Sequence, residues 1–388
     1  MEISTCVKYV GVNDHQVDLF EGQYKVPNGM SYNSYVILDE KIAVMDTVDG
    51  FFTEEWLNNV EQVLDGKMPD YLVIQHMEPD HSASIPAFLK KYPNATVVST
   101  AKGFQFMEQF FPEFFAGQGL PAEQRIVAAN DGVLELGQHS LHFVYAPMVH
   151  WPEVMMTYEA TEKILFAADG FGKFGALDVE EEWADEARHY YIGIVGKYGP
   201  QVQAVLKKAA GLDIQTICSL HGPVLTENLG FYLEKYDKWS SYQPEESGVV
   251  IAYASVYGNT RNAAEYLADV LQEKGQKTVL YDLARCDKAK AVADAFRYDR
   301  LVLAGITYNG DLFPCMRSFI EGLTERNYQN RKVAIIENGT WAPMAGKLIL
   351  GMFEKSKNLT FTETTVSIKS AMNAQNKKEI GKLAEELC

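Results

Sequence analysis

The chain has 388 residues, a formal net charge of −17 and a hydrophobic fraction of 47%. This length favours two domains, and the acidic balance argues against nucleic acid as a partner because phosphate backbones attract basic surfaces. No run approaches the ~20 apolar residues of a membrane helix, and the N-terminus lacks a signal-peptide pattern. The five cysteines form no C-x-x-C pair, which argues against disulfides or an iron–sulfur cluster and favours a reducing cytoplasm.

The first part of the chain is predicted to be rich in strands. Apolar runs predict strands at residues 34–38, 42–46, 71–74, 95–99, 126–128, 132–136, 141–145, 154–158, 163–167 and 214–218. Helices are predicted at 53–64, from 82 onwards, at 105–111 and over 181–210. Cys218 is interpreted as an apolar residue of the last of these strands.

A segment of Pro, Gly, Ser and acidic residues at 242–248 predicts a domain boundary, and we place the domains at 1–246 and 247–388. Beyond it, strands are predicted at 249–254, 278–282, 301–306, 333–337 and 364–368. Helices are predicted at 259–274, 288–296, 315–326, 342–355 and 374–387. Five strands that alternate with five helices predict an α/β domain with a doubly wound parallel sheet.

The stretch Gln75-His76-Met77-Glu78-Pro79-Asp80-His81 follows the predicted strand 71–74 and is dense in metal-binding side chains. Two histidines and two carboxylates lie within six positions, at a strand-to-loop junction that we interpret as a loop rather than a helix. Such a loop can supply ligands to two adjacent metals. The alternative is a solvated polar turn, which rarely combines these residues without Lys, Ser or Gly among them.

Three more potential ligands stand at the ends of predicted strands: His150, Asp169 and His221. Junctions on one edge of a β-rich core converge in space, so we expect all seven residues to meet. The remaining histidines, which we interpret as surface or packing residues, are His15, His139, His142 and His189. Imidazole and carboxylate ligands suit redox-active iron, although zinc also binds such a set.

Three loops of the second domain leave neighbouring strands at their carboxyl ends, where doubly wound sheets bind ligands. Their residues are Ser255, Val256, Tyr257, Gly258, Asn259 and Thr260 after the first strand, Thr307, Tyr308, Asn309 and Gly310 after the third, and Asn338, Gly339, Thr340 and Trp341 after the fourth. Hydroxyls at the start of a helix predict a phosphate site, with an ordinary N-capped helix as the alternative. The absence of G-x-G-x-x-G disfavours a dinucleotide.

These motifs resemble known families. The pattern H-x-[HE]-x-D-H with a later His, Asp and His is similar to the metallo-β-lactamase fold, and the three loops resemble flavodoxin. Glu78 stands where zinc-binding members usually have His, so the whole chain most resembles the flavodiiron protein family. The resemblance implies an N-terminal αββα sandwich and a C-terminal flavodoxin-like, five-stranded parallel sheet that binds FMN, with Trp341 against the flavin ring.

The resemblance also implies roles for individual residues. His76, Glu78 and His150 would hold one iron, Asp80, His81 and His221 the other, and Asp169 would bridge the two. Tyr191 resembles a pocket tyrosine that hydrogen-bonds a bound oxygen species, with packing on the core as the alternative. Asn28 stands where many members place a His over the irons, and residues 338–341 depart from the usual Ser-x-Gly-Trp.

The implied function is reduction of O₂ to water, of NO to N₂O, or both, with electrons that pass through FMN from an external donor. The donor would be a rubredoxin, or alternatively reduced coenzyme F420, and no fused rubredoxin-like domain is expected before Cys388. A head-to-tail homodimer or a dimer of dimers is implied. The alternatives are a zinc-dependent hydrolase with a flavodoxin-like appendage and an electron carrier whose front domain only docks partners.

Overall fold

The computed structural model describes residues 3–117 and 120–388. The chain divides into two compact units, one of Met1–Tyr191 with Pro200–Tyr236 and one of Ile192–Gly199 with Asp237–Cys388. The domain boundary at 246/247 stays a prediction. Among the helices of the described residues, none has both the length and the apolarity that a membrane crossing requires.

Two sheets form the centre of the first unit. The strands of one sheet lie in the order β1 (Val7–Tyr9), β6 (Tyr35–Ile37), β7 (Ala43–Met45), β8 (Tyr71–Val73), β9 (Thr96–Ser99) and β10 (Arg125–Val127). Those of the other lie in the order β11 (Val133–Glu135), β12 (Ser140–Tyr145), β13 (Met155–Glu159), β14 (Ile164–Phe166) and β15 (Thr216–Cys218). Two small pairs add β2 (Val12–Asp14) with β5 (Met30–Tyr32) and β3 (Leu19–Phe20) with β4 (Tyr24–Lys25).

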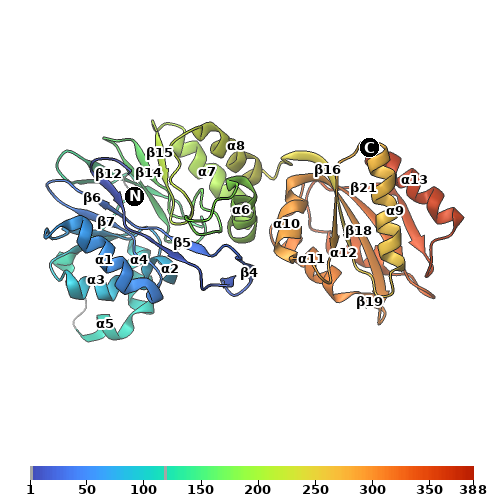
Figure 1. Cartoon of the computed structure of the whole chain (residues 1–388), viewed down its shortest axis with the longest axis horizontal. Coiled ribbons are helices and arrows are strands. Elements are labelled where there is room, and N and C mark those ends of the chain that lie inside the picture. The colour runs from blue at the N-terminus through green and yellow to red at the C-terminus, as the bar shows by residue number, and fades with distance from the viewer. Residues whose placement is uncertain (1–2, 118–119) are drawn as a thin grey trace. The chain divides into compact units, whose positions relative to one another are not determined.

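Helices cover the outer faces of these two sheets (Figure 1). On one side lie α1 (Thr53–Leu64), α2 (Pro79–Ser82), α3 (Ile85–Lys91), α4 (Ala101–Phe110) and α5 (Pro112–Gly117). On the other lie α6 (Trp183–Tyr190), α7 (Gly199–Ala209) and α8 (Leu229–Ser240). The predicted αββα sandwich is therefore confirmed.

The core of the sandwich lies between the sheets. Alternate strand residues point to opposite faces, so Tyr35 and Ile37 of one sheet meet Leu141 and Phe143 of the other in a single buried cluster. Cys218 belongs to the same cluster at 1% exposure, which confirms that it is an apolar strand residue. This packed core fixes the strand ends from which the site residues project.

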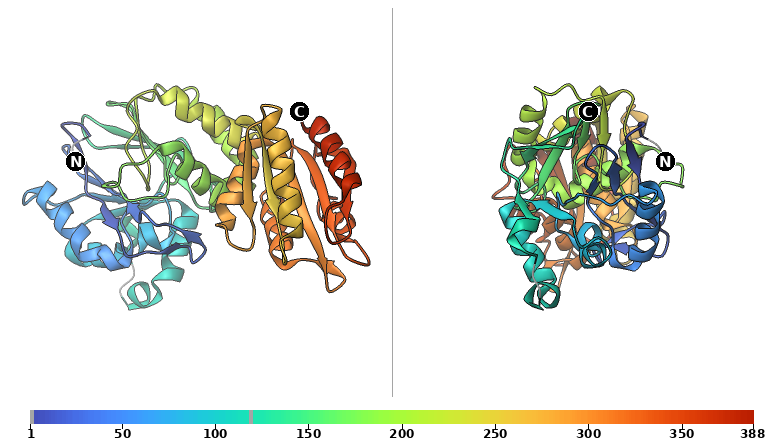
Figure 2. Two further views of the ribbon diagram at one scale, coloured as in Figure 1. Left: turned by 45° about the vertical axis from the view of Figure 1, so that its right-hand side comes forward. Right: turned by 90° about the vertical axis from the view of Figure 1, so that its left-hand side faces the viewer.

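The second unit is built on a parallel sheet whose strand order is 2-1-3-4-5. In that order the strands are β17 (Thr278–Asp282), β16 (Glu246–Tyr253), β18 (Tyr298–Tyr308), β20 (Lys332–Asn338) and β21 (Thr360–Ile368). The short β19 (Asp311–Leu312) pairs antiparallel with β18. Figure 2 shows α9 (Asn259–Glu273) and α13 (Ala374–Leu387) on one face, and Figure 1 shows α10 (Lys288–Arg297), α11 (Pro314–Thr324) and α12 (Ala345–Met352) on the other. The flavodoxin-like prediction is confirmed.

Some local predictions were wrong. Asp80 and His81 do not lie in a loop, because Pro79 begins the one-turn helix α2. The helix predicted over 181–210 is not continuous: α6 is followed by a π-helical turn at Tyr191–Val195 and a 3₁₀ turn at Gly196–Tyr198 before α7 begins. The helix predicted at 105–111 begins earlier, after Thr100, whose side chain accepts the N–H of Gly103.

Candidate functional site

The seven predicted ligand residues meet at one edge of the sandwich, beyond the carboxyl ends of their strands. They form two sets whose potential ligand atoms lie within 4.8 Å of one another. The sets are His76, Glu78, His150 and Asp169, and Asp80, His81 and His221. Every member except Glu78 is buried, which shows that the folded chain holds a polar cluster away from solvent.

The first set surrounds one oxygen of Asp169. Its Oδ2 lies 3.0 Å from Nε2 of His150 and 3.4 Å from Nε2 of His76. Glu78 Oε2 lies 3.0 Å and 3.2 Å from the same two nitrogens. Two imidazole nitrogens and two carboxylate oxygens therefore face a common point.

The second set lies on the other oxygen of Asp169. Its Oδ1 is 3.4 Å from Nε2 of His81. Asp80 Oδ2 lies 3.2 Å from Nε2 of both His81 and His221, and these two nitrogens are 3.0 Å apart. Asp169 thus presents one oxygen to each set, which is the arrangement of a carboxylate that bridges two metals.

Unsatisfied buried atoms show that this cluster fits metal ions. Within the described residues, neither oxygen of Asp80 nor Oδ1 of Asp169 accepts a hydrogen bond of good geometry, although imidazoles lie close by. Buried carboxylates without partners are costly, and nitrogen and oxygen lone pairs that converge on one point are satisfied by a cation. The assignment of these seven residues as ligands is a proposal that this geometry supports.

Two of the imidazoles are held by hydrogen bonds to residues that were not predicted from the sequence. Glu153 Oε1 accepts a hydrogen bond from Nδ1 of His76 at 2.8 Å and another from the N–H of Met77 at 2.9 Å. The carbonyl of Ser31 accepts from Nδ1 of His221 at 2.7 Å. With Nδ1 protonated in each ring, Nε2 is left free to bind a metal.

The pKa values of these residues reflect how closely the imidazoles and carboxylates lie to one another. Burial acts to lower the pKa of His150, but hydrogen bonds to Asp169 and Glu78 outweigh it and raise the pKa to about 9. In the same way the pKa of His76 is raised well above its usual value. Burial acts to raise the pKa of Asp169, yet His76 and His150 lower it well below the usual range.

Aromatic rings enclose the cluster. The ring centroids of Phe20 and Tyr190 each lie 5.4 Å from that of His221, and the Trp151 ring lies 5.3 Å from that of His76. Burial, and then the charges of Asp169 and the other carboxylates, raise the pKa of Tyr190 well above its usual value, so its phenol stays protonated.

The tyrosine beside the cluster is the neighbour of the predicted one. Tyr191 is fully buried with its ring 5.1 Å from that of Tyr236, whereas Tyr190 contacts the proposed ligand His221. The proposed role of Tyr191 toward a bound oxygen species stays a prediction.

Asn28 donates to Glu181 at 2.9 Å. Glu21 contacts the proposed ligand Glu78 and was not predicted.

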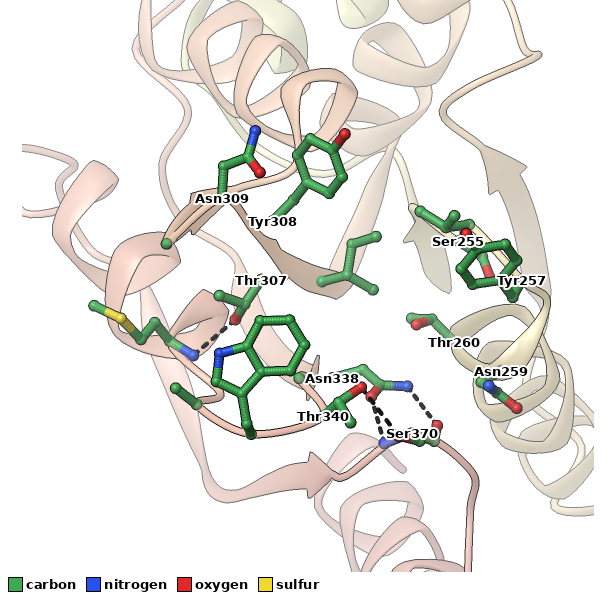
Figure 3. A pocket seen from close by; sticks show the side chains of 17 residues that line it. Ser255, Tyr257, Asn259, Thr260, Thr307, Tyr308, Asn309, Asn338, Thr340 and Ser370 are labelled. Atoms are coloured by element: carbon green, nitrogen blue, oxygen red, sulfur yellow. Dashed lines mark hydrogen bonds between the residues drawn. The ribbon is translucent and has the colours of Figure 1, made fainter.

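The second unit contains a cavity of about 470 Å³ at the carboxyl ends of its strands (Figure 3). Thirteen of the fourteen residues predicted for the flavin loops line it, and Gly258 does not. Gly258 instead has a φ of +90° directly before α9, a conformation that favours glycine and starts the helix. Four lining residues were not predicted: Ile306, Ala342, Met344 and Ser370.

Hydrogen bonds hold the loops of this cavity in place. Thr307 Oγ1 accepts from the N–H groups of Met344 and Ala345 at 2.8 and 3.1 Å and so fixes the start of α12. Asn338 and Ser370 exchange two hydrogen bonds of 2.8 and 3.0 Å.

The cavity fits a flat aromatic molecule that carries a phosphate. Trp341 and Tyr257 line it with 90% and 93% of their surfaces exposed, so both rings are available to a planar ligand. Ser255, Asn259 and Thr260 lie together at the N-terminal end of α9, where backbone N–H groups and the helix dipole favour an anion.

Comparison with known proteins agrees with both halves of this description. Residues 30–222 match the family described as ODP family beta lactamase, and residues 250–360 match a flavodoxin domain, which implies FMN. The anaerobic nitric oxide reductase flavorubredoxin of Vibrio vulnificus is 28% identical over 355 residues, which cover 88% of this chain and 70% of that protein.

Solved structures extend the likeness to the whole chain. The flavodiiron protein of Giardia intestinalis superposes with a TM-score of 0.91 at 26% identity, over 100% of this chain and 96% of that chain. The rubredoxin oxygen:oxidoreductase of Desulfovibrio gigas has the same fold, with a TM-score of 0.91 at 24% identity over 100% and 97% of the two chains. The order of the two domains, the seven-residue cluster and these relatives together show that the chain belongs to the flavodiiron protein family.

Proposed function

We propose that this oxidoreductase reduces O₂ to water, NO to N₂O, or both, at a diiron centre with electrons that arrive through FMN. The observation that carries the proposal is the position of Asp169, whose two oxygens face two separate sets of ligands. A shared carboxylate holds two metals close enough to act on one small molecule. The cofactors, FMN and two iron ions, are those of the family and match the predicted pair.

The proposed division of the ligands is the one that the family resemblance implies. His76, Glu78 and His150 would hold one iron, Asp80, His81 and His221 the other, and Asp169 would bridge them. When bound, FMN and the irons supply the electrons, four for O₂ and two for a pair of NO molecules. The protein keeps each imidazole in the tautomer that offers Nε2, through Glu153 at His76 and the Ser31 carbonyl at His221.

The walls of the cluster favour a small, weakly polar substrate. Phe20, Tyr190 and Trp151 pack their rings against the imidazoles of the proposed ligands, so part of the wall around the cluster is apolar. Such an apolar surround also excludes bulk water from the reacting atoms. Tyr190 keeps its phenolic proton and can donate it as a hydrogen bond toward the cluster.

The electron donor is proposed to be a separate rubredoxin, with reduced coenzyme F420 as the alternative. The exposed Trp341 and Tyr257 at the FMN cavity leave its edge open to such a donor. We also infer a cytoplasmic location. We further infer a head-to-tail homodimer or dimer of dimers, and light scattering would test the number of chains in the assembly. Stopped-flow reduction of the flavin by each donor separately would identify the physiological class.

The decisive experiment is anaerobic. The purified protein, with iron and FMN contents measured, is reduced and then mixed with O₂ or NO while electrodes record consumption. We expect consumption of at least one gas, and its loss in the His150→Ala variant. Failure of the iron-loaded and flavin-loaded protein to consume either gas contradicts the proposal. Two zinc ions and no flavin in the purified protein would instead favour the hydrolase alternative.

A further inference from the structure

A second group of metal-binding side chains lies outside the proposed diiron cluster. Cys6, His139 and Glu162 place a sulfur, an imidazole nitrogen and a carboxylate oxygen within 4.8 Å of one another. His139 immediately precedes β12 and Glu162 precedes β14, whereas the diiron residues His150 and Asp169 follow those same strands. The two groups therefore stand at opposite ends of the second sheet.

The His139 ring is held as metal-binding histidines are held. Its Nδ1 donates to Oδ2 of Asp39 at 2.9 Å, and its backbone N–H donates to the same oxygen at 2.7 Å. Both side chains are only 5% exposed. A histidine that binds a metal through Nε2 usually donates its other N–H to a carboxylate, which sets the tautomer and the orientation of the ring. Nε2 of His139 is thereby left to face the cluster.

The distances suit a small cation. Nε2 of His139 lies 3.9 Å from Oε1 of Glu162, which is too long for a hydrogen bond. Zinc-to-ligand lengths of about 2.0–2.3 Å place tetrahedral ligand atoms about 3.3–3.8 Å apart, so shifts of less than about 1 Å would close the set. The other oxygen of Glu162, Oε2, is buried and accepts no hydrogen bond within the described residues.

Hydrogen bonds hold the backbone near each of the three residues. Leu38 donates its N–H to the carbonyl of Cys6 at 2.9 Å. Glu159 accepts from the N–H of Glu162 at 2.7 Å, and Thr161 donates to the carbonyl of Gln138, beside His139, at 2.8 Å. The cluster thus joins the N-terminal segment to loops of the second sheet, and hydrogen bonds restrain the backbone from which its side chains project.

The local charge also favours a cation. Burial, and then the carboxylates of Glu162 and Asp39, raise the pKa of the Cys6 thiol, with Lys8 acting in the opposite direction. The negative charge of these carboxylates would attract a divalent cation to the same place.

We propose that Cys6, His139 and Glu162 form a binding site for Zn²⁺ or a similar thiophilic divalent cation, separate from the diiron centre. Thiolate, imidazole and carboxylate are all ligands of zinc, and thiolate in particular selects it over magnesium or calcium. Three protein ligands leave a fourth position for water. The cation would join β1, the Asp39 turn and the starts of β12 and β14.

Site-specific alkylation tests the proposal. The protein loaded with iron and FMN is treated with iodoacetamide, with and without one equivalent of Zn²⁺, and alkylation of each cysteine is followed by peptide mass spectrometry. We expect Zn²⁺ to slow alkylation of Cys6 at least about tenfold, because a metal-bound thiolate is a poorer nucleophile. Alkylation of the exposed Cys388 serves as the internal reference and should not change.

Variants make the test specific. His139→Gln and Glu162→Gln should each abolish the protection of Cys6, whereas His142→Gln, in the strand that follows His139 but outside the cluster, should keep it. Iron and FMN contents report whether each variant is folded. If Zn²⁺ leaves Cys6 unprotected in the native chain, or protects it equally in both cluster variants, the site does not exist. Zinc that binds only by replacing iron at the diiron centre would leave Cys6 unprotected, which is the first of these two results.

Discussion

Glu153 accepts the Nδ1–H of His76 at 2.8 Å, and both side chains are almost completely buried, at 1% and 0% exposure. This carboxylate orients a ligand without being one of the seven that converge on the cluster. Glu153 also accepts the N–H of Met77, so it fixes both the ring and the backbone beside it. Such a partner affects metal affinity through the basicity and the orientation of the ring.

The Glu153→Gln variant should therefore bind iron about 10–100-fold more weakly at the His76 position, because the amide loses the negative charge that supports the imidazole. Iron retained per chain at increasing concentrations of a chelator measures the effect. Glu123→Gln, a substitution at an exposed acid outside the cluster, is the matched control and should retain iron like the native protein. Unchanged iron affinity in Glu153→Gln would show that Glu153 has no supporting role.

The division of ligands into two sets predicts different iron stoichiometries. Glu78→Gln removes a carboxylate from one set only, so about one of the two irons should be lost at moderate chelator concentration. Asp169→Asn removes the shared group and should weaken both irons, because each oxygen faces its own set. Iron analysis and Mössbauer spectroscopy distinguish these outcomes. Loss of both irons from Glu78→Gln with retention in Asp169→Asn would contradict the assignment of the bridge.

Iron binding should depend steeply on pH. In the metal-free chain the pKa of His150 is raised to about 9, so this ring is protonated at pH 7 and iron must displace the proton. Affinity should thus fall as the pH is lowered from 9, by about tenfold per pH unit for each proton displaced. Calorimetry in buffers of different ionisation enthalpy counts the protons released. A pH-independent affinity between pH 6 and 8 would mean that the metal-free rings are neutral.

The phosphate end of the flavin can be tested separately from its ring. Thr260 is 2% exposed in the first turn of α9 and lines the cavity. Thr260→Val keeps the shape of the side chain but removes the hydroxyl, so FMN affinity should fall by about 1.5–3 kcal/mol, or about tenfold to 100-fold. Riboflavin, which lacks the phosphate, should bind the variant and the native chain equally well. Equal losses for the two ligands would place the phosphate elsewhere.

How much of the fold could be predicted depended on the burial of each strand. The central residues of β18 and β20 are buried and appear as continuous apolar runs, so the five strands of the main sheet were predicted, whereas the two-residue β19 was not. Strands such as β3, with two residues, carry no periodic signal and exist only because a partner pairs with them.

The residues of the site could also be predicted only in part. The proposed ligands at strand ends were visible in the sequence because polar residues interrupt apolar runs. Glu153 was missed as a partner, since its reach to His76 spans 77 positions and depends on how the two sheets pack. Adjacent Tyr190 and Tyr191 could not be distinguished, because the π-helical turn that begins at Tyr191 sets which ring faces the cluster.

The two aromatic rings at the flavin cavity have a consequence for the life of the protein in the cell. Each ring has a large surface that a planar ligand can cover, and a ligand that binds only the folded chain stabilises it. A chain that has acquired its flavin should therefore unfold less often, and the unfolded chain is the form on which chaperones and proteases act. The abundance of the protein should consequently follow the supply of flavin, independently of transcription.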